Sequence, residues 1–209
     1  MIQEAALPRP MAGVDRSLSL ASDQTLLQLE QDPVYRETLM RFVSLRLIDW
    51  GMRKKDVTYL CGVSSYFLNN TAAAIEHTGG AGPGPWTICR HQVARREAAM
   101  FLVEWMVENE PFRQKPSAVR LATAYRRYVS WHWRDRRRRY IDPSTALAII
   151  RNIGSGQLRL HRCLQCTDLS LQVGKEKGDA RGGTSCSFCG CAHSTQVPLT
   201  RDQRIPAEA

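Results

Sequence analysis

The sequence lacks a long hydrophobic run. Its longest uncharged stretch, residues 57–75, contains six Ser, Thr or Asn residues, whereas a membrane-spanning helix needs about 20 mostly apolar residues. The N-terminal residues also lack the basic start and apolar run of a secretory signal. We therefore expect a cytoplasmic protein with no membrane contact, in which disulfide formation is not the main use of the seven cysteines.

The sequence also lacks the common motifs of catalysis. It has no paired carboxylates in a catalytic pattern, no glycine-rich phosphate loop and no histidine-based metal triad. Two cysteines, Cys61 and Cys89, occur in apolar helical contexts, where an inert buried thiol is the expected state. We therefore predict that the protein is not an enzyme.

Lysine is scarce throughout, and acidic residues are scarce in one segment. Only five of the 29 basic residues are lysine. Residues 111–162 contain thirteen Lys or Arg against two Asp, a net charge of +11, so the rest of the chain carries −2 within the total of +9. Guanidinium groups suit phosphate and guanine edges better than ammonium groups do. The segment indicates a nucleic-acid partner, although a GC-rich genome would also raise the arginine content.

The hydrophobic content of 43% is sufficient for a folded core. Apolar residues recur with helical spacing up to a Gly-Ser-Gly stop at 154–156, interrupted by a Gly- and Pro-rich loop or hinge at 78–85. Two short stretches after residue 157 alternate as strands do, and cysteines appear there in pairs. We predict a mainly α protein in four parts: a flexible arm (1–21), an all-helical DNA- and partner-binding body (22–156), a zinc-binding knuckle (157–193) and a flexible tail (194–209).

Several helix boundaries follow from local sequence. Asp32 and Asp142 each precede a proline, which is typical of an N-cap followed by a first-turn proline. Residues 92–107 have amphipathic helical spacing, and the next helix is expected to begin at Pro116 or Ser117.

Four cysteines form two C-x2-C pairs, Cys163 with Cys166 and Cys186 with Cys189, separated by nineteen residues. Two residues between cysteines let both sulfurs reach one ion, and the spacer can form a hairpin that brings the pairs together. The pattern predicts one structural Zn2+ per chain in a small zinc-ribbon-like knuckle with four cysteine ligands. A redox-active dithiol and an iron–sulfur cluster are the alternatives.

Other potential ligands lie close to these pairs in the sequence. Cys191 could replace Cys189 as the fourth ligand, and His161 and His193 are nearby. The paired cysteines remain the preferred set. Because four thiolates leave no open coordination position, such a zinc stabilises a fold and does not activate water.

Residues 57–68 have the pattern of a helix-turn-helix. Gly62 can take the positive φ of the turn, Ser64 can cap the second helix, and Leu68 can pack that helix against the first. An ordinary helical hairpin has the same turn chemistry. If the hairpin docks on DNA, three side chains of the second helix are expected to contact base edges or phosphates: Ser65, Asn69 and Asn70.

Arginines alternate with aromatic residues between positions 120 and 140. We expect aromatics such as Tyr125 and Tyr128 to be core, which leaves the arginines facing outward. So many like charges favour contact with a polyanion, although a run of charge is also commonly a solvated face. The predicted DNA contacts in this part of the chain are Arg120, Arg126, Arg127, Arg134, Arg136, Arg137, Arg138, Arg139, Arg159 and Arg162.

Taken in order, these features resemble the flagellar transcriptional activator FlhC family. The resemblance extends from about residue 25 to residue 191, and only the cysteine pairs are specific by themselves. The other matching features are the turn at 60–64, Trp86 after the Gly- and Pro-rich loop, and the stretches 96–101, 124–128 and 146–160.

The resemblance implies a bacterial regulator subunit that assembles with an FlhD-like partner, two FlhC-like chains with four partner chains. The complex would bind double-stranded DNA upstream of promoters and activate flagellar genes through RNA polymerase. In that family the paired cysteines bind zinc, and the matching positions here are Cys163, Cys166, Cys186 and Cys189. The zinc region and the neighbouring basic surface are implicated in DNA contact.

The sequence also departs from the family pattern. The spacer between the cysteine pairs is slightly long, Cys191 and His193 are additional, the run at 134–139 is unusually basic, and the arm before Ser22 is an addition. Relatives of the family activate transfer genes of conjugative elements, so a conjugative or other non-flagellar role is an alternative. An RNA-binding zinc-ribbon protein would have the same charge and the same knuckle.

Overall fold

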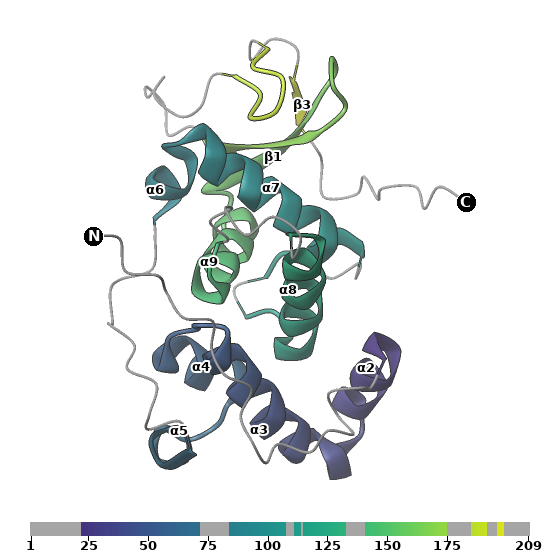
Figure 1. The fold of residues 1–209 in the computed structure, drawn as a ribbon, viewed down its shortest axis with the longest axis vertical. Helices are drawn as coiled ribbons and strands as arrows, with labels where there is room; N and C mark the ends of the chain where they lie inside the picture. The colour runs from purple at the N-terminus through teal and green to yellow at the C-terminus, as the bar shows by residue number, and fades with distance from the viewer. Residues whose placement is uncertain are drawn as a thin grey trace. The chain divides into compact units, whose positions relative to one another are not determined.

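The computed structural model describes residues 22–71, 84–107, 111–113, 115–132, 141–174, 185–191 and 196–198. The chain divides into two compact units, Met1–Gly79 and Gly80–Ala209. The described part is mainly helical, with one small antiparallel sheet in the second unit (Figure 1). The predicted arm at 1–21 and most of the Gly- and Pro-rich loop lie outside these residues, and the predicted domain boundaries stay predictions.

The first unit contains four described helices: α2 (Asp23–Gln31), α3 (Pro33–Asp49), α4 (Lys54–Cys61) and α5 (Ser65–Thr71). Asp32 begins α3 as predicted, because its Oδ1 accepts a hydrogen bond from the backbone N–H of Val34 at 2.9 Å. After the end of α3, Gly51 has φ of 94°, which favours glycine at this turn.

One face of α3 forms the core of the first unit. Val43 and Leu47 are buried there, with exposed fractions of 3% and 0%. Helix α3 packs against α2 and α4, and α4 packs against α5. Leu68 is fully buried on α5. The short helix α5 therefore has one side in the core and one side in solvent.

The second unit contains four further described helices: α6 (Pro85–Cys89), α7 (Gln92–Val107), α8 (Ala118–His132) and α9 (Pro143–Gly154). The bounds of α7 are those predicted from the spacing. Asp142 caps α9, because its Oδ1 accepts a hydrogen bond from the N–H of Thr145 at 2.8 Å. Ser117 caps α8 in the same way through the N–H of Arg120, at 3.1 Å.

Two tyrosines of α8 hold the start of α9 in place. Tyr125 and Tyr128 are buried, which confirms their assignment to the core. The Tyr125 hydroxyl donates to the carbonyl of Ile141 at 2.9 Å, and the Tyr128 hydroxyl accepts from the N–H of Ile141 at 3.2 Å. Tyr128 also donates to Glu97 Oε2 on α7 at 2.9 Å. This buried network satisfies the polar ends of both rings.

The sheet has the order β2-β1-β3, with β1 (Leu158–Cys163), β2 (Leu169–Val173) and β3 (Gln196–Pro198), and both pairings are antiparallel. Strand β2 is more buried than its alternating sequence predicts, because α6 and α7 pack against it. Strand β3 pairs with the end of β1, so three residues of the predicted flexible tail are part of the sheet.

None of the helices in the described part of the chain combines the length and the apolar character needed to cross a membrane.

The two valines of α3 provide a matched test of this fold. Val43→Ala removes two buried methyl groups and is expected to lower the free energy of unfolding by about 2 kcal/mol. Val34→Ala makes the same change at a side chain that is 78% exposed, and its effect is expected to stay within about 0.5 kcal/mol. Urea denaturation followed by circular dichroism measures both; equal effects of the two substitutions would contradict the assigned core.

Candidate metal centre

Each C-x2-C pair lies in a tight turn, and the two turns have the same backbone pattern. In the first, the N–H of Thr167 donates to the carbonyl of Cys163 at 2.9 Å; in the second, the N–H of Gly190 donates to the carbonyl of Cys186 at 3.1 Å. The residue after the second cysteine has positive φ in both turns, 63° at Thr167 and 75° at Gly190. The turns are therefore two copies of one local structure.

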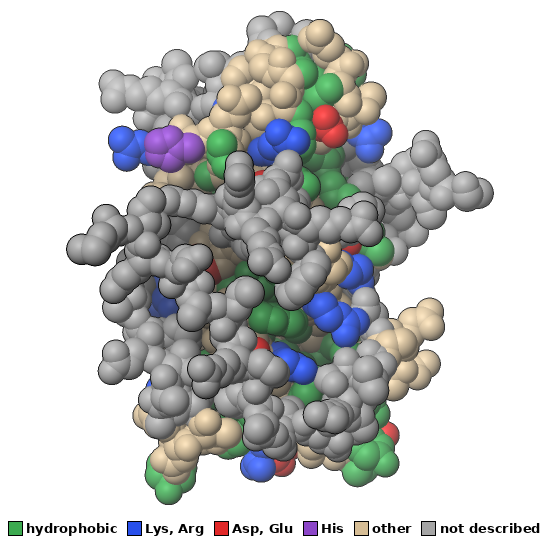
Figure 2. Space-filling model, in the orientation of Figure 1, with side chains coloured by type: hydrophobic (Ala, Val, Ile, Leu, Met, Phe, Trp, Pro, Cys, Tyr) green, Lys and Arg blue, Asp and Glu red, His purple; other side chains and the backbone are tan. Residues whose placement is uncertain are grey.

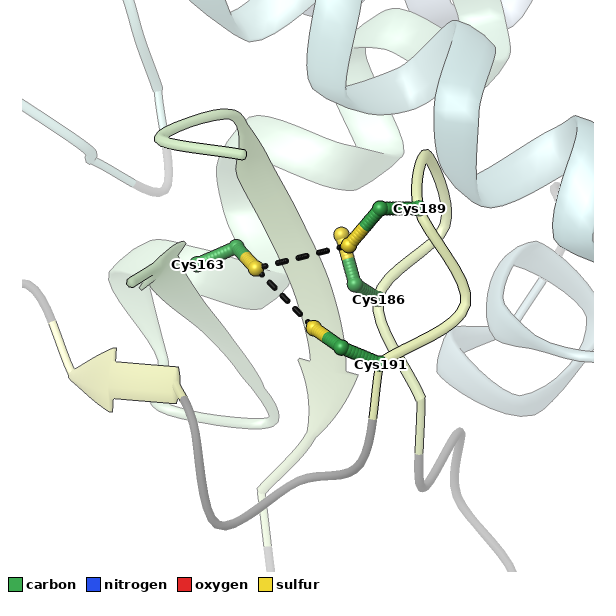
Figure 3. Close-up of side chains that lie close together, drawn as sticks. All are labelled: Cys163, Cys186, Cys189 and Cys191. Atoms are coloured by element: carbon green, nitrogen blue, oxygen red, sulfur yellow. Dashed lines mark hydrogen bonds between the residues drawn. The ribbon is translucent and has the colours of Figure 1, made fainter. Parts of the chain in front are cut away.

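The two turns bring their sulfur atoms together. Cys163 lies at the end of β1, and the second turn faces it from the loop at 185–191 (Figure 3). The Sγ atoms of Cys163, Cys186, Cys189 and Cys191 all lie within 4.8 Å of one another. Cys166 Sγ is also close, at 3.6 Å from Cys186 Sγ. The centre is thus a cluster of five thiols.

The sulfur separations fit a metal ion with four thiolate ligands. In a regular tetrahedron with metal–sulfur bonds of about 2.3 Å, sulfur atoms lie about 3.8 Å apart. The separations of Cys163 from Cys189, 3.7 Å, and of Cys166 from Cys186, 3.6 Å, match this edge. The separation of Cys163 from Cys191 is shorter, at 3.0 Å. The cluster can therefore hold a metal ion.

Backbone amides favour the thiolate form at two positions of the cluster. The N–H of Cys166, with the nearby Cys191 thiol, lowers the pKa of the Cys163 thiol to about 6. The N–H of Cys191 lowers the pKa of Cys189. Burial raises the pKa of the Cys166 thiol. Since metals bind thiolates, the amides prepare Cys163 and Cys189 for ligation before a cation supplies its own charge.

The predicted ligands Cys163, Cys166, Cys186 and Cys189 are all in this cluster, and Cys191 joins them. The group of four that is closest together contains Cys191 and omits Cys166, so the choice of ligands among the five stays a prediction. His161 is buried in β1, and His193 lies outside the described residues.

Three side chains of α7 contact the loop that carries the second turn. Gln92 Nε2 donates to the carbonyl of Ser187 at 3.1 Å, and an Arg95 guanidinium nitrogen donates to the carbonyl of Ser185 at 3.0 Å. The Arg96 guanidinium lies over the ring of Phe188, 5.1 Å from its centroid. No sequence pattern marked these three residues, because helical spacing shows which face of α7 is apolar and not which polar side chain contacts a distant loop.

A scan against protein-family models finds no match, and no curated protein sequence is significantly similar to the chain.

The predicted helix-turn-helix residues lie in α4, α5 and the turn between them. Gly62 has φ of 71°, and the Ser64 hydroxyl accepts a hydrogen bond from the N–H of Phe67 at 3.1 Å. Ser65, Asn69 and Asn70 are all exposed on α5. Their local positions match the expectation, and their role in DNA binding stays a prediction.

The predicted arginine contacts have different surroundings. Arg159 is exposed on β1, and Arg120, Arg126 and Arg162 are half-buried. Arg127 donates from Nε to Glu104 Oε2 at 3.0 Å and from a terminal nitrogen to the Glu104 carbonyl at 3.0 Å. Because this pair is largely shielded from solvent, Arg127 stabilises the contact between α7 and α8.

Figure 2 shows Lys and Arg side chains of the described residues on the face that it draws. The five arginines of the basic run lie outside the part of the chain that the structure describes: Arg134, Arg136, Arg137, Arg138 and Arg139.

Two buried cysteines of the second unit give a matched test of the metal centre. Cys186→Ala removes a thiol from the cluster and is expected to abolish or strongly reduce the metal content of the purified chain. Cys89→Ala removes a buried thiol outside the cluster, whose pKa burial raises to about 11, and should leave the metal content unchanged. Elemental analysis measures both, and equal metal contents would contradict the site.

Proposed function

We propose that this chain is a DNA-binding subunit of a transcription activator of the FlhC kind, with a structural zinc at the cysteine cluster. In this proposal it acts in the cytoplasm, assembles with an FlhD-like partner and activates promoters through RNA polymerase. It has no catalytic role.

The polar surface of α5 carries this proposal. Ser65, Asn69 and Asn70 are exposed on a helix whose opposite side is fixed by buried Leu68. The side-chain Oδ1 of Asn69 accepts a hydrogen bond from Lys54 Nζ at 3.2 Å, so a basic side chain from α4 lies beside this surface. Amide side chains can form paired hydrogen bonds with adenine, and lysine binds phosphate.

The charge distribution supports a polyanionic partner. The +11 segment at 111–162 includes exposed Arg159 on β1 and the half-buried Arg120 and Arg126 on α8. Sequence-independent contacts to phosphate provide much of the affinity of DNA-binding proteins. We assign this role to the arginine segment, with Arg127 set apart because Glu104 already binds it.

A structural zinc ion fits the cysteine cluster better than a metal ion with a catalytic role does. Sulfur-rich tetrahedral sites favour zinc or iron–sulfur centres, and a site closed by four thiolates has a structural role. Cys163, Cys166, Cys186 and Cys189 would hold the ion, and Gln92 and Arg95 would connect the closed site to α7.

Flagellar genes are the first candidate targets, through the likeness to the FlhC family, and conjugative-transfer genes are the alternative. An RNA-binding zinc-ribbon protein is the competing assignment, and it is tested in the same binding experiment.

The chain is co-expressed with the FlhD-like subunit of the same genome. The affinity of this complex for promoter DNA is expected to fall steeply as the salt concentration rises. Six or more phosphate contacts would weaken promoter binding about 10³-fold between 50 and 200 mM salt, because bound arginines release condensed counterions. Footprinting and titration of promoter fragments at several salt concentrations measure this. A flat salt dependence, or RNA binding as tight as binding to the duplex, would contradict the assignment.

Substitutions of two exposed amide side chains of the first unit distinguish base recognition from a general effect of changing the surface. Asn70→Ala on α5 is expected to weaken binding to the footprinted site by about 1 to 3 kcal/mol, with little change for unrelated DNA. Gln28→Ala on α2 also removes an exposed amide and should leave both affinities unchanged. Equal binding by the wild type and Asn70→Ala would exclude this position from base recognition.

A further inference from the structure

Cys191 has no counterpart among the thiols of the first turn. The N–H of Cys163 donates to the carbonyl of Asp168 at 2.9 Å, and the N–H of Cys186 donates to the carbonyl of Cys191, also at 2.9 Å. Cys191 therefore takes in the second turn the position that Asp168 takes in the first. By this equivalence the two turns each supply two ligands, and Cys191 is a fifth thiol beside a complete set of four.

Individual sulfur distances fit the same division, while the four sulfur atoms that lie closest together include Cys191 and omit Cys166. Cys163 to Cys189 and Cys166 to Cys186 have the separation of two ligands of one tetrahedral ion, at 3.7 and 3.6 Å. Cys191 Sγ lies only 3.0 Å from Cys163 Sγ. This is too close for two ligands of a regular tetrahedron, but a small movement brings the pair to the disulfide distance of about 2.0 Å.

Access to solvent also differs between the two thiols. Cys163 is buried, whereas Cys191 is half-buried and lies in the loop that follows the second turn. Cys189 is exposed, but its thiolate would be held by the ion. A small oxidant thus reaches Cys191 more easily than Cys163, and an oxidised Cys191 would have the Cys163 sulfur 3.0 Å away.

We propose that Cys191 is a peroxide-sensitive thiol that forms a reversible disulfide with Cys163 and so opens the metal cluster. This inference rests on the zinc site of the proposed function and adds a modification site to it.

The chemistry requires hydrogen peroxide as the oxidant and balances in two steps. The Cys191 thiol loses its proton to solvent, and its thiolate attacks one peroxide oxygen. The O–O bond breaks, Cys191 becomes a sulfenic acid, and the leaving hydroxide takes up a proton to become water. The Cys163 thiolate, whose proton has also passed to solvent, then attacks the Cys191 sulfur; the S–O bond breaks, the S–S bond forms, and the second hydroxide takes up a proton to become water. Two thiols are oxidised to one disulfide while one peroxide is reduced to two waters.

The disulfide would remove Cys163 from the ligand set. The cluster would then retain three of its four ligands and lose its tetrahedral closure, so its affinity for the ion would fall. A dithiol reductant reverses the reaction by thiol–disulfide exchange and restores all five thiols.

The experiment uses the zinc-loaded full chain and a stoichiometric amount of hydrogen peroxide. A chromogenic chelator measures zinc release, and mass spectrometry of peptides identifies the disulfide. The wild type should release zinc and form the Cys163–Cys191 disulfide, and both changes should reverse with a dithiol and added zinc. Cys191→Ser should bind zinc normally and release it about ten-fold more slowly, and Cys89→Ser should behave as the wild type.

Three results would overturn the proposal: release from Cys191→Ser at the wild-type rate, a disulfide between another pair such as Cys163 and Cys189, or loss of zinc from Cys191→Ser as purified. The last result would make Cys191 a ligand. A wild type that contains no zinc would refute the release step and the zinc of the proposed function together, whereas failure to bind promoter DNA would leave the disulfide chemistry unaffected.

Discussion

The convergence of five thiols on one point is the constraint on which the C-terminal part of the chain depends. Thiolates so close together repel one another unless a cation lies between them. The first turn is continuous with β1, and the second belongs to the loop at 185–191, which contacts Gln92, Arg95 and Arg96 of α7. A bound cation would add to the free energy with which these contacts keep the loop on α7.

In the proposed function, the two units have different roles in DNA binding. The exposed amides of α5 belong to the first unit and suit base edges, while the arginine-rich segment belongs to the second and suits phosphate. Phosphate contacts give affinity without sequence preference, so neither unit alone would provide both strength and selectivity. The pair of Arg127 and Glu104 is largely shielded from solvent. A segment with a basic sequence therefore does not expose all of its charge, because part of that charge is paired within the protein.

Local sequence predicted the helices well because their boundaries depend on short-range chemistry. Asp32 and Asp142 cap the helices that follow them, and residues 92–107 form α7 with the predicted bounds. The pairing of β3 with β1 was missed, because it depends on where a distant strand ends.

The candidate site was likewise predictable where it depends on local spacing, and not where it depends on contacts between distant residues. The C-x2-C spacing located the two turns, whereas the closeness of Cys191 to Cys163 depends on how the turns face each other. The contacts of Gln92 and Arg95 with the loop at 185–191 join residues that are 95 and 90 positions apart, and no local pattern encodes them.

Those contacts couple the cysteine cluster to α7, so that ion binding and the stability of α7 would affect each other. Gln92 and Arg95 are positioned to contact the second turn when α7 is folded. Folding of α7 would therefore favour the arrangement of the turn that binds the ion. If the cluster binds an ion, linkage predicts that a change that stabilises α7 also raises the affinity for the ion, and that the bound ion stabilises α7 in turn. A substitution in the core between α7 and α8 can thus alter metal affinity without touching a sulfur atom.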